Sequence, residues 1–149
     1  MRLVDFTLRQ AIAEDYPAIR TLIRAVHINP TGLDWRQFLI AVMPDGELAG
    51  CGQIKLHADG SRELASIAVR EQFRGRGVAR MLIERLMEEE PRPLFLMCRS
   101  RLGVLYEKFG FHIAKFEDMA PYFQRISRLA RIVEFFARDG DTLLVMRLD

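Results

Sequence analysis

The N-terminal half of the chain alternates between two hydrophobic periods. Residues Phe6–Gln10 read as a strand, whereas residues 19–26 carry apolar side chains at helical spacing and predict a helix that opens near Pro17. Three strand-like runs follow, over residues 38–43, 48–57 and 62–69. Short turns that contain glycine separate these runs, which predicts an antiparallel meander.

The second half of the chain interleaves helical and strand-like segments. Residues 78–87 repeat apolar side chains at helical spacing, and residues 94–98 form a short apolar run. A strand, a helix and a second strand in this order favour a parallel crossover. A further helical stripe ends at Gly110, and residues 142–148 read as a last strand. Mixed α/β is therefore the predicted fold class.

Composition limits the function classes that fit the chain. Its 149 residues suit one domain over residues 1–149, and a hydrophobic content of 50% argues against disorder. A net charge of +2, without a basic stripe interleaved with aromatic residues, argues against nucleic acid as a partner. The apolar runs are too short to span a membrane, and the N-terminus lacks the layout of a signal peptide. We therefore expect a cytoplasmic protein.

The cysteines and histidines indicate neither a disulfide nor a metal site. Cys51 and Cys98 stand alone in apolar stretches, where a reduced cysteine behaves as a small hydrophobic residue. His27, His57 and His112 lie far apart, with no ligand spacing around them.

A glycine-rich segment, Phe73–Met81, lies between the strand-like run 62–69 and the helical run 78–87. The first N–H groups of a helix have no partner within the helix, and the helix dipole places partial positive charge there, so this turn favours an anion. Gly75 and Gly77 allow positive φ and close approach of the backbone to a phosphate. Long-range attraction would come from three arginines, Arg74, Arg76 and Arg80. The alternative is a plain glycine turn with solvated arginines.

Two common phosphate loops do not fit this segment. A Walker loop needs Lys and Ser or Thr directly after its second glycine, where this chain has Val78 and Ala79. A dinucleotide fingerprint needs a small residue where Arg80 stands. The spacing of Arg74, Gly77 and Ala79 instead resembles the pyrophosphate loop of the GNAT superfamily of acetyl-CoA-dependent N-acetyltransferases.

A second motif agrees with this resemblance. Residues Leu105–Phe111, LYEKFGF, lie where the superfamily usually has a helix that ends in a glycine turn and a strand. The resemblance covers roughly residues 3 to 116, and the tail follows it in element order alone. It implies a central mixed, mostly antiparallel sheet flanked by helices. The tail then adds an extra helix before the last strand.

The resemblance implies a site for acetyl-CoA. Backbone groups of the tripeptide Ile67, Ala68 and Val69 would pair with the pantetheine arm like an added strand. The pyrophosphate would be held by the loop residues Arg74, Gly75, Arg76, Gly77, Val78, Ala79 and Arg80. The chain departs from the family at Glu71, where a proline is common, and at Arg99, near the place of an asparagine that helps to fix the arm.

The resemblance also assigns an acid and a base. Tyr106 lies where the family has the acid that protonates the leaving thiolate, and a tyrosine is protonated at working pH. Glu63 matches the glutamate that takes the amine proton through water in the histone-acetylating branch. Glu63 has a second interpretation, as a surface residue paired with Arg62 or Lys55. His57 is another candidate base, because imidazole titrates near neutrality.

The expected function is acetyl transfer from acetyl-CoA to a primary amine by direct attack in a ternary complex. The arginines of residues 98–101 indicate a small-molecule acceptor that is anionic or amino-acid-like. The alternative is an acyl-CoA-binding sensor or interaction module without turnover.

The tail adds a further helix, over Tyr122–Ala137. Its predicted apolar face consists of Ile126, Leu129, Ala130, Val133 and Phe136, with Arg125, Arg128 and Arg131 off this face. We expect the helix to cover the sheet, and a lid over the substrate cleft or a homodimer surface is the alternative.

Overall fold

The chain forms two compact units in a computed structural model that describes residues 6–136 and 140–149. The first unit takes in residues 6–54 and 64–89 of the described chain, and the second takes in residues 55–63 together with residues from 90 onward. Ala137, the last residue of the predicted tail helix, lies outside the described residues, as does the side chain of Phe136 from its predicted apolar face.

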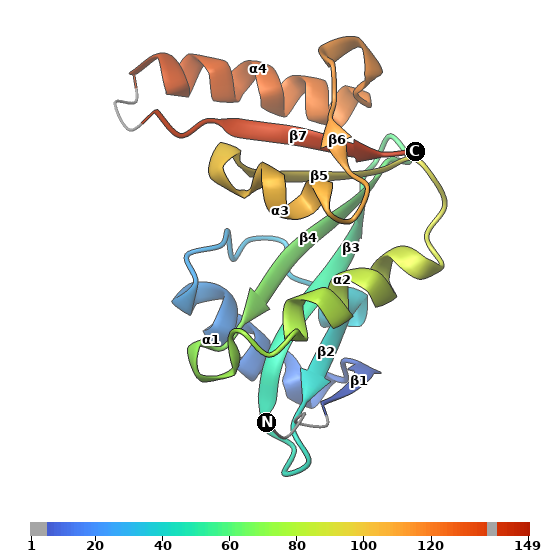
Figure 1. Cartoon of the computed structure of the whole chain (residues 1–149), viewed down its shortest axis with the longest axis vertical. Helices are drawn as coiled ribbons and strands as arrows, with labels where there is room; N and C mark the ends of the chain where they lie inside the picture. Colours follow the sequence, from blue (N-terminus) through green and yellow to red (C-terminus); the bar gives the residue numbers. More distant parts are fainter. Residues whose placement is uncertain (1–5, 137–139) are drawn as a thin grey trace. The chain divides into compact units, whose positions relative to one another are not determined.

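Four strands of the first unit follow the sequence order β1-β2-β3-β4 (Figure 1). They span Thr7–Gln10, Phe38–Val42, Leu48–Leu56 and Arg62–Val69, and the ends of β3 and β4 beyond residues 54 and 64 belong to the second unit. Strand β2 pairs antiparallel with both β1 and β3, as in the register Phe38↔Gln53. The predicted meander is confirmed, since the alternating pattern placed each strand within a residue or two of its observed bounds.

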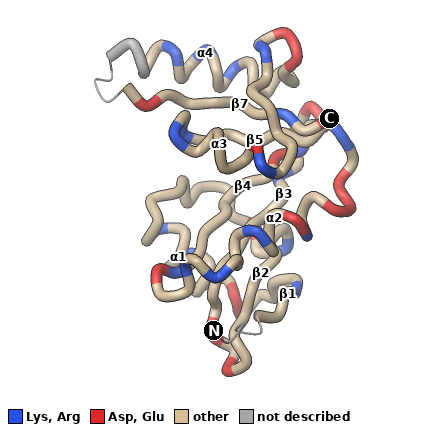
Figure 2. The backbone as a smooth tube through the Cα atoms, in the orientation of Figure 1, with Lys and Arg blue, Asp and Glu red and all other residues tan. Residues whose placement is uncertain are grey.

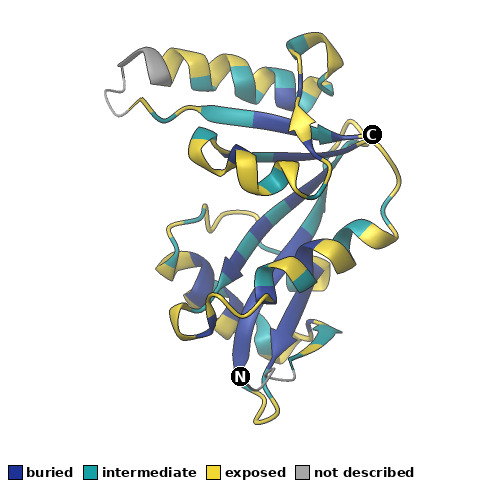
Figure 3. Ribbon diagram, in the orientation of Figure 1, coloured by how far each residue is buried: buried dark blue, intermediate teal, exposed yellow. Residues whose placement is uncertain are grey.

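Two helices cover opposite faces of this part of the sheet. Helix α1 spans Tyr16–Ala25 and packs its buried side chains with Phe38 and Ile40 of β2. Helix α2 spans Val78–Glu88 and packs with Leu39 and Ala41 of the same strand. Because successive residues of a strand point to opposite faces, the two helices lie on opposite sides of β2. All five residues of β2 are buried, which explains its uninterrupted apolar run (Figure 3).

The second unit contains three strands in the order β5-β7-β6, together with the tip of the β3–β4 hairpin. Strand β5 spans Leu94–Arg99, β6 spans His112–Ile113 and β7 spans Leu143–Leu148. Strand β7 pairs antiparallel with both neighbours, so that Leu94 faces Leu148 and His112 faces Arg147. The predicted mixed α/β class, with mostly antiparallel strands and an extra helix before the last strand, is confirmed.

Helices α3 and α4 lie on opposite faces of β5 and β7 (Figure 1). Helix α3 spans Gly103–Glu107, and a Cβ atom on Gly103 would lie 3.0 Å from a methyl group of Leu144, so the helix approaches β7 closely there. Helix α4 spans Pro121–Phe136 and places the fully buried Phe123 in one cluster with Phe95 and Val145. Leu144 and Val145 are neighbours in the strand and therefore point to opposite faces.

The predicted apolar face of α4 is wrong along much of its length. Leu129 and Val133, which the helical period assigned to the buried face, are 60% and 68% exposed. Phe123 is buried instead, and its ring stacks on Phe95 with centroids 4.7 Å apart. Periodicity identifies one side of a helix, but only a neighbouring element can bury that side, and α4 finds this contact in its first turns.

Val133→Ser is expected to change the free energy of unfolding by less than about 0.5 kcal/mol, because an exposed side chain that packs against no other element contributes little. The comparison is with the wild type in urea unfolding followed by circular dichroism. A loss of several kcal/mol would show that the second half of α4 is buried in solution.

The helices of the described chain do not resemble membrane spans, since none combines the length and the apolar character that a crossing needs. Cys51 and Cys98 are both buried and free.

Candidate active site

The glycine-rich segment joins β4 to α2 as the sequence predicts. After Val69 the chain makes a 3-10 turn over Glu71–Phe73 and enters α2 at Val78. Gly75 and Gly77 have φ angles of 77° and 80°, a left-handed backbone that residues with a Cβ atom rarely adopt. Phe73 fixes the turn to the protein interior. Its side chain is buried, and its ring meets that of Phe6 edge-on with centroids 5.9 Å apart.

The backbone of this loop presents a row of unused donors. The first helical hydrogen bond runs from the N–H of Met81 to the carbonyl oxygen of Gly77, at 3.0 Å. Among the described residues, no group accepts a hydrogen bond from any backbone N–H between Gly75 and Arg80. A Cβ atom on Gly75 or Gly77 would meet nothing within 4 Å, so the space in front of the loop is open. Open space and free donors at a helix N-terminus fit a pyrophosphate.

The three arginines of the loop differ in how far they are available to an anion. Figure 2 marks basic positions in blue where the chain enters α2. The Nε of Arg80 lies 2.8 Å from a carboxylate oxygen of Glu84, and this contact raises the pKa of Arg80. Arg74 donates from Nε to the carbonyl oxygen of Val69 at 3.3 Å, and Arg76 lies over the ring of Phe73. Within the described chain, Arg74 and Arg76 have no carboxylate partner, so they are the better anion ligands of the three.

The predicted pantetheine segment, residues 67–69, follows a break in strand geometry. Ser66 has a φ of 59°, and its hydroxyl accepts a hydrogen bond of 2.7 Å from the side chain of Gln53. A left-handed residue inside a strand interrupts the regular pairing of backbone groups. Gly50 is needed beside this segment, since a Cβ atom there would lie 2.9 Å from the carbonyl oxygen of Ala68.

The second unit brings together Glu63 and His57, two candidates for the base. Nε2 of His57 lies 2.8 Å from Oε1 of Glu63, and the two side chains are 12% and 6% exposed. The interpretation of Glu63 as a surface residue paired with Arg62 or Lys55 is therefore wrong. Arg62 pairs with Glu90 instead, at 3.1 Å. The hairpin turn explains the pairing, because it returns β4 beside the end of β3.

Aromatic rings from α4 cover the histidine. The ring of Tyr122 stacks on His57 with centroids 3.6 Å apart and planes at 15°, and Phe123 meets the same imidazole edge-on at 5.5 Å. The backbone N–H of Tyr122 donates to Asp59 at 2.9 Å, which ties the start of α4 to the hairpin turn. Burial, followed by the negative charge of Glu63, raises the pKa of Tyr122. Sequence reasoning assigned Tyr122 no role at this site.

The carboxylate of Asp59 accepts hydrogen bonds both from its own turn, at Ser61, and from the start of α4, at Tyr122. The side-chain hydrogen bond from Ser61, followed by the backbone N–H groups of Tyr122 and Ser61, lowers the pKa of Asp59 to about 2. A carboxylate whose folded-state pKa is depressed stabilises the fold above its unfolded pKa, and this stability is lost as pH falls through the folded value.

Asp59→Asn is therefore expected to lower the free energy of unfolding by about 1 kcal/mol at neutral pH, an amount that allows for solvent screening of this exposed side chain. The difference from the wild type should shrink as pH falls from about 4 to about 2. Urea unfolding at several pH values measures this difference. An equal deficit at every pH would mean that the charge of Asp59 contributes nothing.

Tyr106 lies in α3, whose end is built by Gly110. The N–H of Gly110 donates to Glu107 and that of Phe111 donates to Tyr106, the two hydrogen bonds of a Schellman ending, so Gly110 occupies the predicted C′ position. Burial, with a smaller contribution from Cys98, raises the pKa of Tyr106 to about 12. The hydroxyl therefore stays protonated at neutral pH, as a hydrogen-bond donor must.

The arginine-rich segment after β5 is already partly neutralised. Ser100 donates to Asp141 at 2.7 Å, and Arg101 lies 3.7 Å from the same carboxylate. Arg99 lines an open hollow together with these residues. Arg101 is one of the arginines predicted to bind an anionic acceptor, and it already has an acidic partner within the chain.

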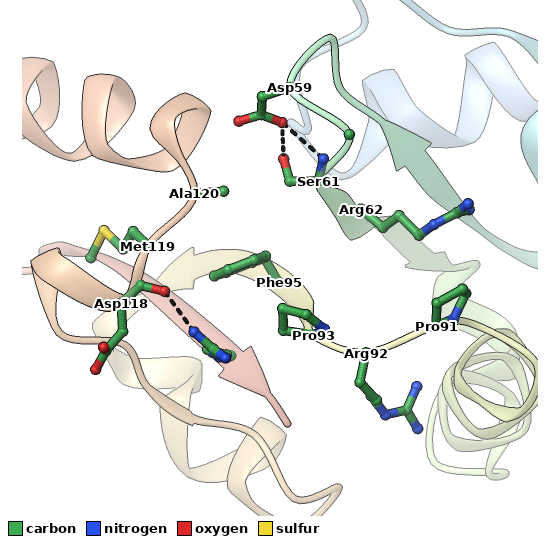
Figure 4. Close-up of a pocket in the computed structure, with 12 residues that line it drawn as sticks. Asp59, Ser61, Arg62, Pro91, Arg92, Pro93, Phe95, Asp118, Met119 and Ala120 are labelled. Atoms are coloured by element: carbon green, nitrogen blue, oxygen red, sulfur yellow. Dashed lines mark hydrogen bonds between the residues drawn. The ribbon is translucent and has the colours of Figure 1, made fainter.

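The second unit also has a cavity of about 400 Å³ that the sequence did not predict (Figure 4). It lies at the start of β5, where Pro93 and Phe95 form one wall, and Asp59 and Ser61 form another. Arg147 lines it too, and donates to the carbonyl oxygen of Asp118 at 2.9 Å. Tyr106 follows the other end of β5, so this cavity and the candidate acid lie at opposite ends of that strand.

Comparison with solved structures finds the same fold in several proteins, acetyltransferases among them. N-acetylglutamate synthase from Neisseria gonorrhoeae, solved with coenzyme A and N-acetyl-glutamate, matches with a TM-score of 0.72 and 23% identity, over 97% of this chain and 35% of its own. ElaA from Escherichia coli matches with a TM-score of 0.70 and 17% identity, over 97% of this chain and 100% of its own. The ribosomal-protein-S18-alanine N-acetyltransferase from Escherichia coli matches with a TM-score of 0.69 and 21% identity, over 97% and 93%.

The chain spans about a third of the length of the Neisseria enzyme, and at these identities the likeness concerns the fold. No curated protein sequence matches the chain. The sequence model of the acetyltransferase (GNAT) domain matches residues 34–113, more than half of the chain, and this stretch includes the glycine loop, Glu63 and Tyr106. The chain therefore belongs to the GNAT acetyltransferase family.

Proposed function

We propose that this protein transfers an acetyl group from acetyl-CoA to a primary amine by direct attack in a ternary complex. The row of free N–H groups from Gly75 to Arg80 carries the proposal, because it offers a phosphate-sized anion several donors at a helix N-terminus. Coenzyme A in the solved Neisseria relative supports the same cofactor. In this proposal Arg74 and Arg76 add charge to the loop, and Ile67, Ala68 and Val69 hold the pantetheine arm.

The reaction needs a base at the amine and a proton donor at the departing sulfur. An alkylammonium with a pKa near 10.4 is almost entirely protonated at neutral pH, and only the free amine can attack a thioester, so a base must take its proton. The proposed base is Glu63 or a group linked to it, and His57 is the other candidate. The departing thiolate is stabilised by a hydrogen bond from the hydroxyl of Tyr106, which remains protonated because burial raises its pKa to about 12.

The acceptor is proposed to be a small amine that is amino-acid-like or anionic. Arg99 supports this proposal, since it lines an open hollow beside α3 and can meet a carboxylate. One solved relative is named for N-acetylglutamate, and another is named for an alanine of ribosomal protein S18.

Thiol release from acetyl-CoA tests the proposed function. The purified protein is incubated with acetyl-CoA and a panel of amino acids, polyamines, aminoglycosides and peptide N-termini, and free thiol is measured. Release with an amino-acid-like amine supports the proposal. Tight binding of coenzyme A without release for any amine would instead support an acyl-CoA-binding module without turnover.

A further inference from the structure

His57 and Glu63 form a buried pair whose geometry assigns different roles to the two side chains. The carboxylate of Glu63 is 6% exposed and lies 2.8 Å from Nε2 of His57. A carboxylate can only accept a hydrogen bond, so Nε2 carries the proton in the neutral ring and Nδ1 carries the lone pair. Within the described residues Nδ1 has no hydrogen-bond partner, whereas Nε2 is held by Glu63.

The surroundings of the pair hold the imidazole in one orientation. Tyr122 covers one ring face at 3.6 Å, and Phe123 meets the ring edge-on. The turn that carries His57 is closed by hydrogen bonds of 2.9 Å to Ser61 and from Gly60. Among the described residues, Asp59 in the turn interacts electrostatically with His57, and Tyr122 on α4 interacts with Glu63 and with Arg125.

We propose that His57 is the base that takes the acceptor's proton, and that Glu63 is a positioning residue that acts through the imidazole. The inference rests on the proposed function and refines it. It also makes α4 part of the proposed active site, because the ring of Tyr122, at the start of this helix, stacks on the imidazole of His57. The arrangement is the usual one for an imidazole base, in which a buried carboxylate orients one ring nitrogen and the other nitrogen exchanges the proton.

The acceptor ammonium loses two protons in the course of the step. Nδ1 of His57, directly or through water, takes one proton from the ammonium and leaves a free amine, and the resulting imidazolium is paired with Glu63. The amine nitrogen forms a bond to the thioester carbonyl carbon, and the carbon–sulfur bond breaks. The sulfur ends as a thiol, and the attacking nitrogen loses its second proton. One proton therefore reaches the sulfur and one is released to solvent through the pair.

The test compares His57→Gln and Glu63→Gln by their values of kcat/KM. His57→Gln is expected to lower kcat/KM by about 100-fold. Glu63→Gln keeps more activity, because the imidazole remains and loses only the carboxylate that orients it. His112→Gln is the matched control, since His112 forms an exposed pair with Asp149 at 3.0 Å and should leave kcat/KM unchanged.

A second readout does not depend on activity. In wild-type protein with ¹⁵N-labelled histidine, the ring spectrum should show Nε2 protonated and Nδ1 unprotonated at alkaline pH, and Glu63→Gln should remove this preference. A wild type that acetylates no amine would defeat the proposed function, while the ring spectrum still tests the pair. Full activity of His57→Gln beside an inactive Glu63→Gln would overturn the inference and make Glu63 the base. The opposite tautomer would overturn it too.

Discussion

Tyr106→Phe is expected to lower kcat by about 100-fold or more while the Kd for acetyl-CoA changes by less than about twofold. The variant keeps the ring that meets Phe111 edge-on at 6.4 Å, and it loses only the hydroxyl that would donate to the departing sulfur. Because burial raises the pKa of Tyr106 to about 12, its ionisation should not reduce kcat at mildly alkaline pH. The effect therefore belongs to catalysis and should persist across the neutral range.

Steady-state kinetics with a saturating acceptor, together with calorimetric titration of acetyl-CoA, separates the two effects. Tyr16→Phe is a matched control, since Tyr16 lies at the start of α1 and its ring contacts Arg20. Equal turnover in Tyr106→Phe and the wild type would remove Tyr106 from the mechanism. A parallel loss of affinity would place it in cofactor binding.

Gly77→Val is expected to weaken acetyl-CoA binding by at least about tenfold. Gly77 has a φ of 80° and is the N-cap of α2, so a valine would either shift the backbone donors or place its methyl groups where the pyrophosphate should lie. The space in front of Gly77 is empty of protein atoms within 4 Å, so any clash is with the ligand.

Backbone strain alone could also weaken the protein, and a second glycine controls for it. Gly46 has a φ of 88° in the β2–β3 turn of the same unit, and a Cβ atom added there would meet nothing within 4 Å. Gly46→Val should therefore have a similar strain of about 1–2 kcal/mol and bind acetyl-CoA normally. Calorimetric titration of both variants decides the matter, and unaltered binding by Gly77→Val would refute the phosphate-loop assignment.

The elements of the fold were predictable because each is specified by neighbouring residues. The two hydrophobic periods identified β2, α2 and β7 closely, since a strand or a helix buries residues at fixed spacing whatever it packs against. The positive φ angles of Gly75 and Gly77 were predictable for a similar reason, since glycines in a short turn between a strand and a helix readily adopt them.

The candidate site was predictable in part. The family motif identified Tyr106 and the loop, and it identified Glu63 as a residue of interest. It could not show that Glu63 is buried against His57, because the alternative partners Arg62 and Lys55 also lie within a few residues of it on the same hairpin. Arg80 also read as an anion ligand, although its closest partner is Glu84, one helical turn later.

By itself, then, the sequence determined the order of strands and helices, the glycine turn with its free N–H groups, and the family. The tertiary structure alone decided which part of α4 is buried and what surrounds Glu63. The hydrogen bond between Asp59 and Tyr122 joins residues 63 positions apart, and the ring of the same tyrosine stacks on His57. Such contacts arise where separate segments meet, and a hydrophobic period cannot report them because it records only whether a side chain seeks burial, not which partner buries it.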